Sequence, residues 1–322
     1  MQIRSEGPVS EVVELPVTVV ICAYTMRRWD TIHAAVGSVL AQRPGPAQVL
    51  LVVDHNPELA RRARDELVGV EVLESDEPAG LSGARNAGLK AAKHPITAFL
   101  DDDAQARPGW LAALVRPYES GGIVATGGHV EPRWPDRRPY WLPREFDWVV
   151  GCSYVGLPAD GGFVRNPIGA SMSMNTQLAR DVGGFDVMVG RVGTRPAGCE
   201  ETELSIRLTG ARPGSAIYYA PDSVVDHQVS ADRVRFAYLV RRCWYEGLSK
   251  ASVVRLSGAT AGLERERRQA AVVIPRSFIR ETGELLRGRG SALPRMAVTA
   301  SGLAMTIGGY LTGQFRYMVG KA

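Results

Sequence analysis

The chain has 322 residues, of which 45% are hydrophobic and 22% charged. This balance is typical of a folded protein with a sizeable core, and it excludes an intrinsically disordered chain and a small disulfide-stapled scaffold. The four cysteines are far apart and form no Cys-x-x-Cys pair. This spacing argues against a zinc knuckle or a redox motif and favours a reducing cytoplasm. Three glutamates within residues 1–16 argue against a secretory signal.

The net charge of +4 is unevenly distributed along the chain. Residues 231–322 contain 16 basic and 6 acidic side chains, whereas residues 1–230 contain 22 basic and 28 acidic ones. A basic segment attached to a mildly acidic body indicates an anionic partner, such as a phospholipid surface or a lipid phosphate. No nucleic-acid-reading motif accompanies the basic residues, so we expect no nucleic-acid partner.

Strand and helix patterns alternate along the first third of the chain. Short apolar runs rich in β-branched residues predict strands buried on both faces, and amphipathic patterns between them predict helices. The expected strands are residues 17–23, 49–53, 70–73 and 96–100. The expected helices are residues 30–40, 57–67, 83–92 and 108–118. The alternation predicts an α/β fold in which helices flank both faces of a mostly parallel sheet.

The pattern becomes irregular between residue 123 and about residue 193. Several tryptophans and prolines fall within residues 134–143, and such a stretch is often functional surface. Residues 200–208 read as a helix. Residues 216–227 read as one or two short strands interrupted by Pro221.

Residues 231–322 read as a basic helical extension of a body formed by residues 1–230. We expect basic helices at residues 233–256 and 264–286. Residues 296–315 carry no charge and are long enough to span a bilayer, but Gly, Ser and Thr dilute their hydrophobicity. A packed helical hairpin, a transmembrane helix and a helix attached to a membrane surface remain open, and we favour surface attachment.

Acidic residues follow two of the four predicted strands. Asp54 comes after the second strand, and Asp101, Asp102 and Asp103 come after the fourth. The carboxyl ends of parallel strands are where open α/β sheets bind ligands. Three adjacent aspartates repel one another unless a cation is bound, and oxygen ligands suit Mg²⁺ or Mn²⁺ bridging to a diphosphate. The alternative is a solvated turn that caps the next helix.

The phosphate-binding motifs of several enzyme classes are missing. No G-x-G-x-x-G follows the first predicted strand, which argues against a dinucleotide-dependent oxidoreductase. Residues 83–90 approach a P-loop but lack its adjacent Gly-Lys and its Ser or Thr. The nucleophile elbow G-x-S-x-G of α/β-hydrolases does not occur. The acidic motifs therefore point to another kind of nucleotide chemistry.

Five segments resemble the family 2 glycosyltransferases, which have the GT-A fold. In chain order they are VTVVICAYTM, LVVDHN, GLSGARNAGL, FLDDDA and GCEETELSIRL, within residues 17–250. The resemblance implies a Rossmann-like, mostly parallel sheet with flanking helices. It also implies transfer, with inversion, of a monosaccharide from a nucleotide-diphosphate sugar, with UDP-sugars favoured, to an acceptor hydroxyl. The basic extension favours a glycan or polyprenyl-linked acceptor in cell-envelope synthesis, with peripheral contact at the inner face of the cell membrane.

The resemblance also assigns roles to individual residues. The family's base is normally the Asp of a Glu-Asp pair at a helix start. Here the pair is Glu200-Glu201, so Glu201 takes that place and Glu200 is the alternative. Acidic residues also stabilise a helix start by themselves, which is a purely structural explanation. Arg242 and Trp244 match a segment that flanks the family's active site, and we expect them to contact phosphate or acceptor.

The donor and the metal ion are assigned in the same way. Asp54 corresponds to the residue that contacts the base, although His55 replaces a second Asp, and Arg85 would contact base or phosphate. Asp103 and His227 would bind Mg²⁺ or Mn²⁺. The residues expected to bind the nucleotide sugar are Ala23, Tyr24, Asp54, Ser82, Arg85, Asp101, Asp102, Gly169 and Ala170.

Two other functions remain open at this point. A nucleotidyltransferase also combines a metal ion, carboxylates and a similar sheet, but it would normally have a glycine-rich loop after the first strand, which residues 24–28 lack. A non-catalytic sugar- or lipid-binding module would have no need for both acidic groups.

Overall fold

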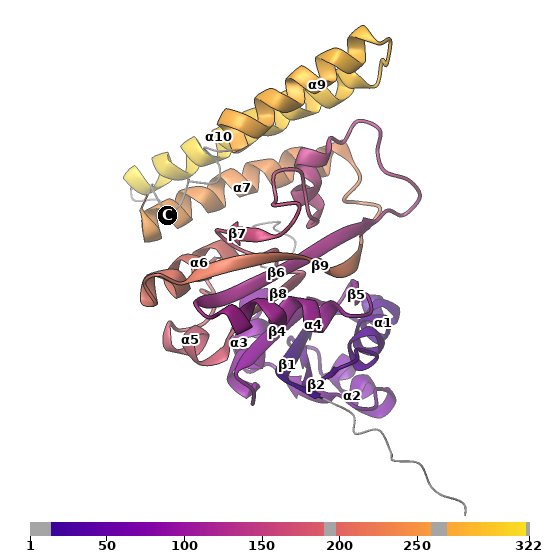
Figure 1. The fold of residues 1–322 in the computed structure, drawn as a ribbon, viewed down its shortest axis with the longest axis vertical. Helices are drawn as coiled ribbons and strands as arrows, with labels where there is room; N and C mark the ends of the chain where they lie inside the picture. The colour runs from indigo at the N-terminus through magenta and orange to yellow at the C-terminus, as the bar shows by residue number, and fades with distance from the viewer. Residues whose placement is uncertain (1–13, 190–197, 259–268, 320–322) are drawn as a thin grey trace, which may run out of the picture.

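The computed structural model describes residues 14–189, 198–258 and 269–319 (Figure 1). Nine strands within this described part form one sheet. They are β1 (Glu14–Ala23), β2 (Gly45–Val53), β3 (Glu71–Glu74), β4 (Ile96–Asp101), β5 (Ala104–Ala106), β6 (Ile123–Arg133), β7 (Gly162–Val164), β8 (Ser171–Asn175) and β9 (Ala216–Gln228). The helices are α1 (Trp29–Leu40), α2 (Pro57–Glu66), α3 (Leu81–Ala91), α4 (Trp110–Val115), α5 (Thr176–Asp181), α6 (Glu200–Ala211), α7 (Phe236–Ser257), α9 (Ile274–Leu286) and α10 (Ala292–Met318).

The order of the strands brings the expected site residues to one end of the sheet. The order is β3-β2-β1-β4-β8-β6-β9-β5, with β7 beside β9. The strands β1 to β4 run parallel, whereas β8 is antiparallel to β4 and β6. Because Leu100 pairs with Ser171, β8 begins where β4 ends. The segment before β8 therefore lies at the carboxyl ends of β1, β2 and β4.

Alternating side chains of the central strands build two apolar layers, one on each face of the sheet. Val19 and Ile21 of β1 belong to a cluster that also contains residues of α1, α2 and α4. Val20, between them, belongs to a second cluster with residues of α3, α5 and α6. Helices therefore cover both faces, as expected for a sheet whose central strands are apolar on both sides.

The helices α7, α9 and α10 form a third layer, farthest from α1 and α2 (Figure 1). They share an apolar cluster with η3 (Arg144–Val150), which includes Phe146, Val149 and Ile274. Within the described residues, no helix combines the length and the apolar character that crossing a membrane requires.

The sequence predicted the first part of the fold well and the middle part less well. All four strands and four helices expected before residue 118 are present, with ends shifted by a few residues. The expectation of irregular structure from residue 123 is wrong for β6, an 11-residue strand. Residues 216–227 belong to one strand, β9, whose pairing with β6 shifts next to Pro221.

The remaining expectations concern the later part of the chain. The uncharged segment 296–315 is the interior of α10, which packs along α7. Most of residues 1–16, and residues 190–193 and 264–268, lie outside the described residues. The division of the chain after residue 230 stays a prediction.

Candidate active site

Two aspartates and a histidine converge beyond the end of β4. Asp101 is the last residue of this strand. Ala104 of β5 pairs with His227 of β9, so that Asp103 is brought beside the imidazole, with 3.2 Å between Asp103 Oδ1 and His227 Nε2. Ligand atoms of Asp101, Asp103 and His227 all lie within 4.8 Å of one another. Two carboxylates and an imidazole fit a divalent cation such as Mn²⁺.

Arg28, after β1, contacts the other side of the aspartate run. Its Nη1 lies 2.5 Å from Asp102 Oδ1 and 3.2 Å from Asp103 Oδ2. Burial raises the pKa of Asp102 to about 7, although Arg28 opposes this effect. Burial would also raise the pKa of Asp103, but His227 and Arg28 outweigh it and hold that pKa below its usual range. Asp102 therefore faces Arg28 rather than the cleft.

Arg85 is the cationic centre of the site. Its side chain is only 2% exposed, and its Nη1 lies 3.1 Å from Glu201 Oε1 and 3.4 Å from Glu200 Oε1. Its Nη2 lies 3.4 Å from Asp101 Oδ1 and donates to the carbonyl of Gly169. Burial lowers the pKa of a guanidinium, yet the carboxylates outweigh this effect and raise the pKa of Arg85. The residue expected to contact base or phosphate thus holds three carboxylates together.

The candidate bases stand at the start of α6. Glu200 is buried, whereas Glu201 is partly exposed to the cleft. The carboxylate of Glu201 lies against Gly169, where an added Cβ would collide with it and with Arg85. Gly169 thus leaves space that Glu201 occupies, and Ala170 also lines the cleft.

The residues expected at the nucleotide lie at the ends of β1 and β2. The backbone N–H of Asp54 donates to the carbonyl of Ala23, and Asp54 Oδ2 accepts from the N–H of Gly80 at 2.9 Å. Tyr24 is exposed beside them. Ser82 is buried at the start of α3 and donates to the carbonyl of Val189 at 3.0 Å. These residues lie at the same sheet edge as the acidic cluster. The four that were expected to bind the nucleotide sugar do not line the cleft described next; they are Ala23, Tyr24, Asp54 and Ser82.

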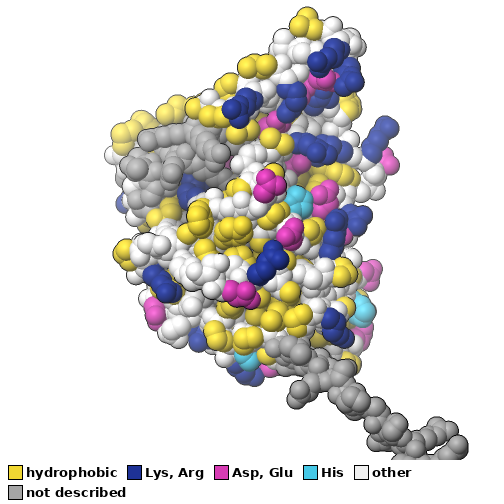
Figure 2. Space-filling model, viewed as in Figure 1, with side chains coloured by type: hydrophobic (Ala, Val, Ile, Leu, Met, Phe, Trp, Pro, Cys, Tyr) yellow, Lys and Arg dark blue, Asp and Glu magenta, His cyan; other side chains and the backbone are white. Residues whose placement is uncertain are grey.

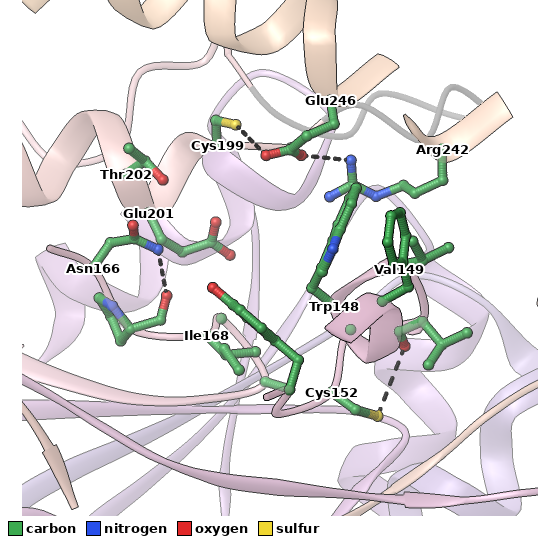
Figure 3. Close-up of a pocket in the computed structure, with 18 of the residues that line it drawn as sticks. Trp148, Val149, Cys152, Asn166, Ile168, Cys199, Glu201, Thr202, Arg242 and Glu246 are labelled. Carbon is green, nitrogen blue, oxygen red and sulfur yellow. Dashed lines mark hydrogen bonds and ion pairs between the residues drawn. The ribbon is translucent and has the colours of Figure 1, made fainter. Parts of the chain in front are cut away.

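A cleft with a volume of about 320 Å³ lies between Asp101, Arg85 and Glu201 on one side and the helical layer on the other. The α6 side of its wall includes Glu201, and the α7 side includes Arg242 and Glu246 (Figure 3). Arg242 Nη1 lies 2.7 Å from Glu246 Oε2. The indole ring of Trp148 lies beneath the same guanidinium, with 5.4 Å between Arg242 Cζ and the ring centroid. Figure 3 also shows the hydrogen bond that Cys199 Sγ donates to Glu246 Oε1, which links the start of α6 to α7.

Several lining residues were not identified from the sequence, and the expected acceptor residue Trp244 does not line the cleft. Trp148, Glu246 and Lys250 line the cleft. Glu246 lies four residues from both Arg242 and Lys250, and this spacing was the available signal for an ion-paired helix face. Trp244 packs against Gly308 of α10 and does not line the cleft.

Comparison with known proteins identifies the family. The model described as Glycosyl transferase family 2 matches residues 18–183, which is more than half of the chain. The protein is a family 2 glycosyltransferase. The glucosyl-dolichyl phosphate glucuronosyltransferase of Haloferax volcanii is 35% identical to this glycosyltransferase over 240 residues, which are 73% of this chain and 76% of the relative. The nucleotidyltransferase and the non-catalytic module are therefore set aside.

Solved structures confirm the GT-A fold of this glycosyltransferase. The mannosyltransferase PcManGT from Pyrobaculum calidifontis, in complex with GDP-Man and Mn²⁺, has a TM-score of 0.61 at 17% identity over 92% of this chain and 87% of its own. GalNAc-T7, with UDP, GalNAc and Mn²⁺, has a TM-score of 0.52 at 17% identity over 73% of this chain and 50% of its own.

Proposed function

We propose that this glycosyltransferase moves a monosaccharide from a nucleotide-diphosphate sugar, with a UDP-sugar favoured, to a hydroxyl of a polyprenyl-linked or other cell-envelope glycan. The transfer inverts the anomeric configuration and takes place at the inner face of the cell membrane. The observation that carries the proposal is that Asp101, His227 and Glu201 line one cleft, with Asp103 beside His227 and with Arg85 joining Asp101 to Glu201. Transfer requires that the cation site, which would hold the donor, and the base, which would activate the acceptor, lie in the same cleft.

The donor half of the proposal uses the end of the sheet. Ala23, Tyr24 and Asp54 would take the nucleotide, and Asp101, Asp103 and His227 would hold a divalent cation near its diphosphate. Mg²⁺ and Mn²⁺ are both candidates, and the presence of Mn²⁺ in both solved structures supports a cation of this charge. Bound there, the ion would offset the negative charge that develops on the leaving diphosphate.

The acceptor half depends on Glu201. Its carboxylate would take the proton of the acceptor hydroxyl as the oxygen attacks the anomeric carbon, opposite the leaving diphosphate. Attack from that side accounts for inversion. Arg85 holds Glu201 and Asp101 on the same guanidinium, so it would fix the base relative to the donor site.

Two observations support a lipid-linked acceptor. The Haloferax volcanii relative is named for a dolichyl phosphate substrate. The cleft wall also contains Arg233, Arg242 and Lys250, and basic side chains suit a lipid phosphate. Trp148 adds an apolar face to this wall, as sugar and prenyl groups require.

Replacing the candidate base tests the proposal. We expect Glu201→Gln to reduce transfer from a panel of UDP-sugars to polyprenyl-phosphate glucose by about 10² to 10⁴-fold, the range typical of lost general-base catalysis. Nucleotide-sugar binding with Mn²⁺, measured by thermal shift, should persist, because Gln keeps the shape of the side chain.

Glu200→Gln is the matched control, since Glu200 also contacts Arg85. It should retain more transfer activity than Glu201→Gln. If the order is reversed, Glu200 is the base. If neither change reduces transfer, the assignment of general-base catalysis to this pair is wrong.

A further inference from the structure

The outer face of α10 is apolar along its whole length. Arg316 is the exposed charged residue of this helix, and the exposed apolar residues recur every three or four positions. They are Leu293, Ala297, Ala300, Ala304, Ile307, Leu311, Phe315 and Met318. The largest of them are well exposed, with Leu311 at 61%, Phe315 at 60% and Met318 at 77%. We call these eight residues the α10 outer stripe.

The inner face of the same helix is made of small residues. Gly302 lies against Phe146, Gly309 against the backbone of Trp244, and Gly313 against Ala251. A helix on a water-soluble protein normally points its large apolar residues inward. Small residues inside and large apolar residues outside are instead typical of a helix that faces lipid.

The charge around the outer stripe is mainly positive. Residues 269–319 contain six arginines and two glutamates. The side chain of Glu281 is buried, at 4% exposure, that of Glu284 is 19% exposed, and both are paired with arginines. Arg287 and Arg289 are exposed at the end of α9, and Figure 2 shows basic side chains gathered beside apolar ones on this end of the molecule. A second copy docked face to face would set these positive charges against each other, whereas anionic lipid head groups would neutralise them.

We propose that the α10 outer stripe lies in the surface of an anionic bilayer, with its large side chains among the acyl chains and the arginines of α9 and α10 at the head groups. The helix lies along the membrane instead of crossing it, in agreement with the lack of a spanning helix among the described residues. This inference rests on the proposed lipid-linked acceptor and names the surface that meets its membrane. Leu303 and Thr306 of α10, which do not belong to the outer stripe, line the cleft, so binding would bring the cleft next to the acceptor's lipid.

Vesicle co-sedimentation of the full chain tests the proposal. We expect binding to phosphatidylcholine vesicles that contain phosphatidylglycerol, weaker binding to phosphatidylcholine alone, and weakening by salt. The double variant Leu311→Glu/Phe315→Glu should lose roughly a hundredfold or more in partitioning, because each side chain no longer gains from leaving water. Val68→Glu, at a residue 87% exposed between α2 and β3, should bind as the unchanged protein does.

Equal binding of the double variant and the unchanged protein would overturn the proposal. It would also be overturned if light scattering found that the unchanged protein is a dimer and the double variant a monomer, because the stripe would then bind a second copy of the chain. Thermal shift with UDP-sugar and Mn²⁺ distinguishes a failure of the membrane proposal from a failure of the proposed function. The double variant should keep the shift, whereas absence of any shift in the unchanged protein would count against the donor site alone.

Discussion

At the scale of single residues, buried charge organises the site. Nothing in the helical pattern around Arg85 distinguishes it from other residues of that helix. In the fold its guanidinium is buried, and it is neutralised by ion pairs with Asp101, Glu200 and Glu201. An unpaired guanidinium in that position would cost several kcal/mol. Sequence similarity suggested that Arg85 belongs to the site, but only burial shows that its partners are carboxylates.

Glu246 offers a test of a second buried ion group. Burial would raise its pKa, but Lys250 and Arg242 outweigh that effect and hold the pKa below its usual range. The ionised form therefore stabilises the folded state above the unfolded pKa of 4.5, and this contribution declines as the pH falls further. We expect Glu246→Gln to lower the free energy of unfolding at pH 7 by about 3 kcal/mol, because Arg242 and Lys250 each lose a carboxylate contact in a buried position.

Urea unfolding of this variant at several pH values measures the effect. The difference from the unchanged protein should shrink as the pH falls below 4.5. Glu66→Gln is the control, since Glu66 pairs with Arg62 on the surface. It should change the free energy of unfolding by less than about 1 kcal/mol. Equal losses in both variants would contradict the structural role of Glu246.

At the scale of elements, glycine brings α7 and α10 into close contact. A Cβ on Gly309 would overlap the backbone carbonyl of Trp244, and one on Gly247 would overlap the carbonyl of Thr306. The glycines that make residues 296–315 a poor membrane span are thus the residues that let the two backbones approach. Low hydropathy in this segment reflects packing against α7.

Gly309→Ala should therefore destabilise the protein, although Ala favours helices. We expect a loss of about 1 to 3 kcal/mol in the free energy of unfolding, the usual range for overpacking against a fixed backbone. Gly210→Ala in α6 is the control, because nothing lies within 4 Å of its added Cβ. There Ala should be neutral or stabilise by up to about 1 kcal/mol. Denaturant titration compares the two, and a stable Gly309→Ala would disprove the tight contact.

Close packing also explains why the sequence pattern does not predict β6. Gly127 and Gly128 interrupt the apolar pattern of this strand, and glycine is normally depleted in strands. In the fold, Pro167 lies where a Cβ on Gly127 would be, and Ser171 and Ser223 crowd the same position on Gly128. The neighbours that require these glycines are remote in sequence, so no local pattern could reveal them.

At the scale of the whole molecule, the metal group couples ligand binding to stability. Asp103 lies in the turn between β4 and β5 and His227 lies on β9, so a cation with a nucleoside diphosphate should bind only the folded chain. We expect UDP with Mn²⁺ to raise stability by about 2.7 kcal/mol at one hundred times its Kd. Thermal shift should detect this increase, and a chelator should remove it.

Asp103→Asn should abolish the metal-dependent increase. Asp222→Asn, at an exposed residue of β9 that pairs with Arg116, should keep it. An increase that survives both chelation and Asp103→Asn would rule out this cation site.

The sequence by itself determined the parallel half of the sheet, the acidic residues at its edge and the family. Such features depend on local periodicity and on motifs that stand next to each other in the chain. The tertiary structure alone decided that Arg85 binds three carboxylates, that Trp244 lies against α10 and that Trp148, Glu246 and Lys250 line the cleft. These properties depend on which distant segments meet and on which side chains lose water, and neither is encoded in the spacing of neighbouring residues.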